Sequence, residues 1–353
     1  MLQKLTQRLK AAKLKAVDTY KGVSEDVNDG RPWLKLVAIG FAVLMVVLII
    51  WGWFKSQEPE TFDVQQRISA YVKPEHVNVK GVATTVALLE VMEAMLDGYV
   101  SNDIFPPGVW LDNRANWEYG VLIQVRDLSK ALREAYSRSQ SQSREDKALM
   151  IADPLFNFDN SSWIMPNTER EYRSGMKQVQ DYLNRLVDSD RHSAQFYARA
   201  DNLNYWLSTV ESRLGSLSQR LSASVGQRRL NIDLAGDNAA VQSTSVPGEL
   251  EVKTPWLEID DVFYEARGSA WALIHILRAV EIDFADVLQK KNAAVSIQQI
   301  VRELEATQES VFSPIILNGS GFGILANHSL VMGSYISRAN AAIINLRELL
   351  AQG

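Results

Sequence analysis

The feature that most constrains this chain is an apolar run from Leu36 to Phe54, 19 residues without a charged side chain. At 1.5 Å per residue, a helix of this length spans roughly 28 Å, close to the thickness of a bilayer's hydrocarbon core. Trp33 precedes the run, and Trp51 and Trp53 lie at its other end, where indole rings favour the headgroup region. We therefore predict a membrane span over residues 36–54.

Two other interpretations of the run are a buried core helix and a cleavable signal peptide. Soluble helices of this length carry a polar face, which this run lacks. A signal peptide has a shorter apolar region followed by small residues, whereas this run ends with Trp51-Gly52-Trp53-Phe54. The sequence favours a span over both.

The charges are distributed unevenly around the run. The 353 residues contain 37 Lys and Arg and 42 Asp and Glu, a net charge of −5. Residues 1–35 hold eight basic and four acidic side chains, which leaves 29 basic and 38 acidic side chains after Phe54. The acidic main part argues against nucleic-acid binding, which needs a positive surface. A single span cannot form a channel or transporter by itself.

The orientation of the span follows from Lys and Arg near its ends. Within 20 residues the counts tie at three on each side, and within 35 residues they are eight before and four after. This favours a cytoplasmic N-terminus. The main domain then lies in the periplasm of a bacterium, anchored in the inner membrane. The absence of cysteine agrees with an oxidising compartment, and it excludes disulfides and thiol catalysis.

Residues 1–35 are predicted to be a basic amphipathic cytoplasmic tail, because leucines and alanines recur every three or four residues between basic side chains. The candidate membrane-surface residues are Lys4, Arg8, Lys10, Lys13 and Lys15. They either attach the tail to anionic lipid or serve only as a topology determinant. Within the span, Ala38-x-x-x-Ala42 would permit close helix approach and self-association.

Helical periodicity dominates the remainder of the chain. Four segments are predicted: a tether over 55–80, a region of long helices over 81–229, a β-hairpin or loop insertion over 230–256, and a C-terminal helical region over 257–353. The C-terminal helical region is expected to pack on the region of long helices. Individual helices are predicted over 82–99, 116–138, 260–288, 292–312 and 324–350. The expected fold is therefore mainly α: one transmembrane helix, then a periplasmic multi-helix bundle with a minor β-hairpin.

Two details of the long-helix region are open. Thr168-x-x-Glu171 has the pattern of a capping box and predicts a helix start. The apolar pattern that follows breaks near 188–193 and resumes up to Leu221. This predicts either two helices packed as an antiparallel hairpin or one continuous helix with a stutter.

Signs of chemistry are sparse. None of the four histidines has metal-motif spacing, and neither a G-x-S-x-G elbow nor a phosphate-binding P-loop is present, so we expect no metal and no cofactor. The candidate catalytic residues are Asp260, Asp261, Glu265, His275 and His328. The competing interpretation is that the acids cap or solvate a helix N-terminus and that His275 is a core histidine.

Residues 310–337 contain no charged side chain and include a Gly-rich loop from Asn318 to Gly323. The candidate ligand-binding residues are Asn318, Gly319, Ser320, Gly321, Gly323 and Asn327. Backbone N–H groups of such a loop can hold a ligand at the start of the next helix. The alternative is a tight connection that needs glycine only for its backbone geometry.

With the basic tail, the Trp-flanked span and the long cysteine-free helical body considered together, the chain resembles a family of uncharacterised proteobacterial inner-membrane proteins known only as a domain of unknown function. The likeness is closest around Trp256–Arg278 and Asn318–Gly323. It implies an envelope location and carries no activity. The first functional hypothesis is a non-enzymatic scaffold or adaptor that docks an envelope partner. The alternative is a periplasmic hydrolase or ligand-binding protein that uses the Gly-rich loop and nearby acids.

Overall fold

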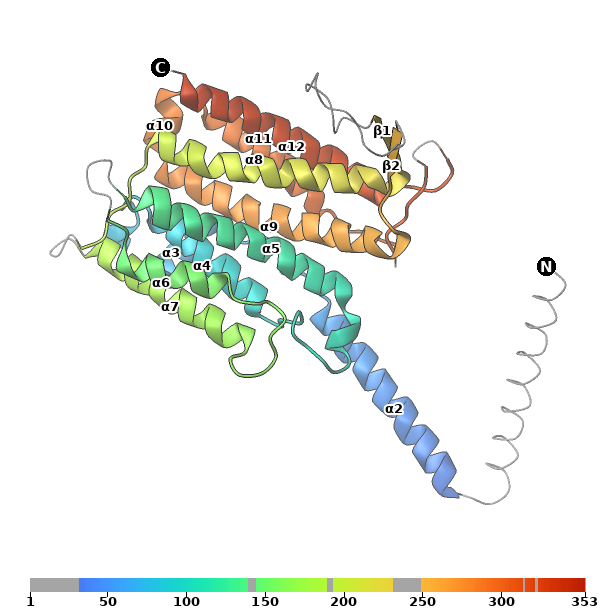
Figure 1. Cartoon of the computed structure of the whole chain (residues 1–353). Coiled ribbons are helices and arrows are strands. Elements are labelled where there is room, and N and C mark those ends of the chain that lie inside the picture. The colour runs from blue at the N-terminus through green and yellow to red at the C-terminus, as the bar shows by residue number, and fades with distance from the viewer. Residues whose placement is uncertain are drawn as a thin grey trace, which may run out of the picture. The chain divides into compact units, whose positions relative to one another are not determined.

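A computed structural model of the chain describes residues 32–138, 144–188, 193–230, 249–313, 315–320 and 323–352. The chain divides into two units, residues 1–54 and residues 55–353. The described part of the first unit belongs to the helix α2 (Pro32–Lys55) (Figure 1). Among the described helices, α2 is the one long and apolar enough to cross a membrane. The tail residues Lys4, Arg8, Lys10, Lys13 and Lys15 lie outside the described residues.

The second unit, which we call the body, is mainly α-helical, as the sequence predicts. Its α-helices are α3 (Val64–Tyr71), α4 (Val82–Leu96), α5 (Asp112–Ala131), α6 (Lys147–Phe156), α7 (Thr168–Val187), α8 (Ala200–Ser222), α9 (Ile259–Asp283), α10 (Ala285–Lys290), α11 (Ala294–Glu305) and α12 (His328–Ala351). Shorter helical turns are η1 (Pro74–His76), η2 (Gly108–Trp110), the π-helical η3 (Leu132–Tyr136), η4 (Ala223–Val225), η5 (Trp256–Glu258) and η6 (Ala306–Gln308).

Helix α9 is the centre of the body. It packs against α5, α4, α11 and α12, and Figure 1 shows α5 and α9 between α8, α11 and α12 on one side and α3, α4, α6 and α7 on the other. Every residue from 266 to 277 is buried. A helix that is apolar on all sides belongs in the middle of a bundle, and this stretch of α9 is nearly so.

The crossing of α5 and α9 depends on two glycines. A Cβ atom on Gly268 would lie 2.0 Å from the carbonyl oxygen of Trp117, and one on Gly120 would lie 2.1 Å from the carbonyl oxygen of Glu265. The Ser269 hydroxyl donates a hydrogen bond to the Gly120 carbonyl at 3.1 Å. The two backbones are therefore in direct contact, and only glycine fits at these positions.

Both predicted arrangements of the residues from Tyr172 to Leu221 are wrong. Helix α7 ends at Val187 and α8 begins at Ala200, so the helix is not continuous. The two do not form a hairpin either, because α7 packs on α6 and α4 while α8 packs on α12 and α5. The apolar stripes that the sequence shows are covered by helices distant in the chain.

The capping-box pattern predicts the start of α7 correctly, but the side chain of Thr168 does not cap the helix. Thr168 is the first residue of α7, and its hydroxyl hydrogen is shared between the carbonyls of Asp159 and Ser162, which lie 2.8 and 3.0 Å from the hydroxyl oxygen. Thr168 therefore fastens the preceding loop and does not cap the helix. The amide of Glu171 instead donates to the Asn167 carbonyl within the first helical turn.

The minor β-hairpin is confirmed as a two-stranded antiparallel sheet. Strand β1 (Gln227–Leu230) pairs with β2 (Glu249–Val252), with Arg228 opposite Glu251. Strand β1 begins three residues before the alternation that predicted it. The residues between the strands, 231–248, lie outside the described part of the chain.

Candidate functional site

The three candidate acids lie in the first turns of α9, where two of them have defined partners. The Asn116 side-chain amide donates to Asp261 at 2.7 Å. Burial and the neighbouring Asp260 and Asp112 carboxylates raise the pKa of Asp261 to about 6. Glu265 accepts two hydrogen bonds from the Arg220 guanidinium, at 2.7 and 2.5 Å. Glu265 is thus held in a bidentate ion pair.

His275 is a core histidine. Its side chain is fully buried on α9 and stacks on the Phe62 ring, with 3.7 Å between ring centroids, while the Trp271 ring meets its edge. Burial, and then the positive charge of Arg278, lower the pKa of His275 to about 3, and a weaker interaction with the Phe62 backbone acts in the opposite direction. Neither ring nitrogen has a hydrogen-bond partner among the described residues. His275 is therefore neutral near pH 7 and closed off from substrate.

His328 is the first residue of α12 and is separated from the candidate acids. Its Nδ1 accepts a hydrogen bond from the Leu317 amide at 3.1 Å. It lines a mostly apolar cavity of about 370 Å³ beside Phe312 and Met332. Glu265 lines another cavity, of about 330 Å³, between α5, α8 and α9. The structure therefore places His328 and Glu265 in different cavities.

The Gly-rich loop is held by its own asparagines. The Asn327 amide donates to the Asn318 side-chain oxygen at 2.8 Å and to the Gly319 carbonyl at 2.6 Å, and its oxygen caps α12 by accepting from Leu330 N–H. Asn318 in turn donates to the Ser224 carbonyl at 2.9 Å. A Cβ on Gly319 would lie 2.1 Å from the Leu325 carbonyl oxygen. This geometry supports the tight-connection interpretation.

Ser320 and Gly323 are exposed in this loop, whereas Gly321 lies outside the described residues. Ligand binding at these positions stays a prediction. In the described part of the chain, no group of three or more His, Asp or Glu side chains is placed to hold a metal ion.

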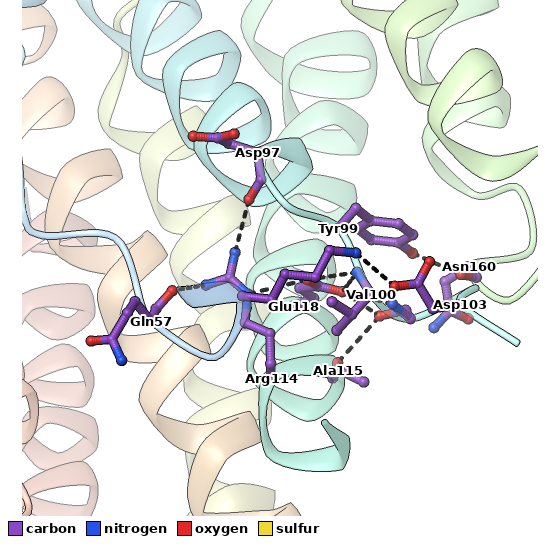
Figure 2. A network of polar contacts seen from close by, with 11 residues as sticks. Gln57, Asp97, Tyr99, Val100, Asp103, Arg114, Ala115, Glu118 and Asn160 are labelled. Atoms are coloured by element: carbon purple, nitrogen blue, oxygen red, sulfur yellow. Dashed lines mark hydrogen bonds and ion pairs between the residues drawn. The ribbon is translucent and has the colours of Figure 1, made fainter. Parts of the chain in front are cut away.

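A densely bonded polar site among the described residues is one that the sequence analysis missed. It lies where the body begins, and we call it the junction: residues 55–62 together with Asp103, Arg114, Glu118, Arg267 and His275, which surround them. Lys55 donates to Asp103 at 2.7 Å. Arg114 donates to the Gln57 carbonyl at 3.2 Å, as Figure 2 shows. Arg267 donates to the Glu58 carboxylate at 2.6 Å. The segment predicted as a tether is thus fastened to α5 and α9.

Arg114 and Glu118 form a buried ion pair at the start of α5. They are 3% and 1% exposed, and their charged groups approach to 3.2 Å (Figure 2). Glu118 also accepts from the amides of Val100 and Ser101 and from the Ser101 hydroxyl. Burial raises the pKa of Glu118, and Arg114 and these donors oppose the increase. Since all of these partners are donors, they fit the ionised carboxylate.

Arg114 has further contacts that extend the pair. Its guanidinium donates to the Asp97 carbonyl at 3.3 Å and lies 4.4 Å above the Trp117 ring. A buried ion pair contributes little net stability, but removal of one partner leaves a costly unpaired charge. The pair therefore holds the end of α4, the start of α5 and the backbone of residue 57 in one arrangement.

Arg267 joins the junction to the other side of the body. Its side chain is largely buried, and it donates to the carbonyls of Thr307, Gln308 and Glu309 at 2.8 to 3.1 Å, in addition to Glu58. These carbonyls follow the C-terminal end of α11, where a cation is favoured. One sequence signal could have revealed this site: Arg267 is the single charged residue between 266 and 277.

The junction and the body fall within one family match. Residues 28–353 match the family described as "Uncharacterized protein conserved in bacteria (DUF2333)". The chain belongs to this family. Its matched region includes the apolar helix and the whole body, whereas most of the basic tail lies outside it. This confirms the resemblance to a bacterial family without an assigned activity. No curated protein and no solved structure matches the chain.

Proposed function

We propose that this family member is a single-pass inner-membrane protein of the bacterial envelope whose helical body acts as a non-enzymatic scaffold or adaptor. In this proposal α2 is the anchor, the N-terminus is cytoplasmic and the body is periplasmic. The observation that carries the proposal is the junction, because the residues directly after the apolar run are bonded into the body by Asp103, Arg114 and Arg267.

The physical consequence of the junction is that the residues directly after the apolar run belong to the body and do not form a long free linker. A flexible linker would let the body move away by about 5–6 Å times the square root of the linker length. Here Lys55 is bonded to the loop between α4 and α5, Gln57 to α5 and Glu58 to α9, so the segment is held at three places. An adaptor that presents a partner at a set distance needs such rigidity, whereas an enzyme acting on a diffusing substrate does not.

A surface suited to a protein partner lies around the apolar cavity at the start of α12. Phe312 and Val331 line this cavity and are exposed, and Ile315, Ile324 and Leu325, which lie between them in the sequence, are exposed as well. Contiguous exposed apolar side chains mark interaction sites on soluble surfaces. We infer that an envelope protein, or a second copy of this chain, covers this surface.

The alternative, a periplasmic hydrolase or ligand-binding protein that uses residues 318–323 and nearby acids, has less support. His275 is closed off, Glu265 is paired with Arg220, and the loop asparagines bond to each other. The raised pKa of Asp261 is the remaining feature that suits acid–base chemistry.

The orientation is tested by single cysteines, because the chain has none of its own. Lys4→Cys and Val295→Cys are expressed separately, and cells with a permeabilised outer membrane are treated with a membrane-impermeant maleimide. Val295 is 76% exposed on the body. The proposal expects labelling at 295 and none at 4 until the inner membrane is opened. The reverse pattern would place the body in the cytoplasm.

The scaffold role is tested by photo-crosslinking in intact membranes. A photoreactive amino acid replaces Ile324, and the control replaces Lys177, which is exposed on α7. We expect a discrete adduct at 324 that the control lacks. Recovery of the uncrosslinked chain alone at position 324 under every growth condition would argue against a docking function.

A further inference from the structure

Two loops of the body lie side by side near the junction. One connects α4 to α5 and the other connects α6 to α7. The Tyr99 hydroxyl donates to the Asn160 carbonyl at 2.7 Å, and the Asn102 amide donates to the Ser162 carbonyl at 3.0 Å and to Glu169 at 2.7 Å. These bonds join the two loops into one surface.

This surface carries large apolar side chains that point into solvent. We call them the apolar rim: Ile104, Phe105, Trp110, Trp163, Ile164 and Met165. Each is between 43% and 88% exposed. Such a group on adjoining loops is unusual for a soluble surface and marks a contact with a partner or a membrane. Two of the six are tryptophans, whose rings favour the lipid headgroup region.

The connection of the body to the predicted span indicates what covers the rim. Lys55 directly follows the last apolar residue of the predicted span and is paired with Asp103, the neighbour of Ile104. Gln57 is bonded to Arg114, four residues after Trp110. If residues 36–54 cross the bilayer, Lys55 lies at the headgroups. Ile104 and Phe105 directly follow Asp103, the partner of Lys55, so this part of the rim is then close to the headgroups as well.

We propose that the apolar rim inserts into the lipid bilayer surface beside the anchor, so that the body rests on the membrane as well as being tied to it. The occupant is the boundary between headgroups and acyl chains. The sequence near the rim residues carries four acids, at 97, 103, 112 and 159, so attraction to anionic lipid is not expected to drive this contact. This proposal rests on the membrane anchoring in the proposed function.

The test uses the full chain reconstituted in phosphatidylcholine vesicles. Phe105→Cys and Met165→Cys are labelled with an environment-sensitive fluorophore, and nitroxide-bearing lipids serve as quenchers of known depth. The control label is at Val295→Cys, an exposed position in the first turn of α11, and Figure 1 shows that this helix follows α10 and packs beside α12. Unfolding temperatures of the labelled proteins confirm that each variant is folded.

We expect shallow nitroxides to quench the labels at 105 and 165 about threefold or more above the label at 295, as insertion by several ångströms requires. Replacement of part of the lipid by phosphatidylglycerol should leave the quenching unchanged. Equal quenching at all three positions would overturn the proposal. So would quenching that appears only with anionic lipid, because that is an electrostatic contact.

Resistance of the same protein to alkaline carbonate extraction separates the two proposals. A chain that stays in the membrane but shows no rim quenching retains its anchor and lacks the lipid contact. A chain that is extracted by carbonate has no anchor, and both proposals then fail.

Discussion

At the scale of single residues, His275 is expected to make the body sensitive to acid. Its pKa is about 3 in the folded protein, against 6.5 in the unfolded chain, so the unfolded state binds the proton more readily. The stability from neutral His275 is complete above pH 6.5 and is lost as the pH falls from 6.5 towards 3. Between pH 7 and pH 4 this loss is roughly 3 kcal/mol.

His275→Phe tests this expectation, because it keeps the aromatic stack on Phe62 and removes the titration. We predict that the variant loses roughly 3 kcal/mol less free energy of unfolding between pH 7 and pH 4 than the wild type does. Urea unfolding of the detergent-solubilised chain at several pH values measures the difference. Parallel pH profiles for the two proteins would contradict a depressed histidine pKa.

Asp261 makes stability depend on pH in the opposite direction to His275. Its pKa is about 6 in the folded protein and 3.8 in the unfolded chain, so ionisation between pH 4 and pH 6 removes stability. We predict that Asp261→Asn, which can still accept the hydrogen bond from Asn116, stabilises the body above pH 6 and has no effect near pH 3. Water screens this partly exposed site, so the gain is at most about 1 kcal/mol. Unfolding temperatures at pH 3.5 and pH 7.5 provide the comparison, and a gain at both values would contradict the raised pKa.

At the scale of elements, the crossing of α5 and α9 is the least tolerant contact. We predict that Gly268→Ala destabilises the body by roughly 3 kcal/mol, because its Cβ would collide with the Trp117 carbonyl and force the helices apart. Gly215→Ala on α8 is the matched control. Its Cβ would meet Asn340 at an ordinary 3.5 Å, so it should stabilise the helix by about 1 kcal/mol. Thermal unfolding monitored by circular dichroism distinguishes the two, and equal effects would show that the crossing is not close.

The helices themselves could be predicted from sequence, but their pairing could not. The apolar period places α7 and α8 within a few residues of their ends. The same period says nothing about which neighbour covers each stripe, and α8 in fact lies against α12. Thr168 illustrates the same limit. Its hydroxyl is bonded to the preceding loop, and a four-residue capping pattern cannot show that this loop folds back onto the helix start.

At the scale of the whole molecule, one ion pair joins residues that are 209 positions apart, Glu58 and Arg267. We predict that Glu58→Ala lowers the free energy of unfolding by about 2 kcal/mol, because the largely buried Arg267 loses its charged partner. The exposed Glu60 is two residues away, and Glu60→Ala should have an effect below about 0.5 kcal/mol. Urea unfolding measures both variants. Similar values would mean that the tether is not part of the body's stability.

The sequence alone determined the apolar helix, the mainly α class and the short hairpin, because each depends on local period or composition. It also determined the membership of a bacterial family, because residues 28–353 match that family along their length. Only the tertiary structure decided that the predicted tether is bonded into the body, that His275 and Glu265 are already engaged, and that Lys55 is paired with a loop that carries exposed apolar side chains. These features arise where residues far apart in the chain meet. Their formation depends on burial and hydrogen-bond geometry between helices, which no short window of sequence contains.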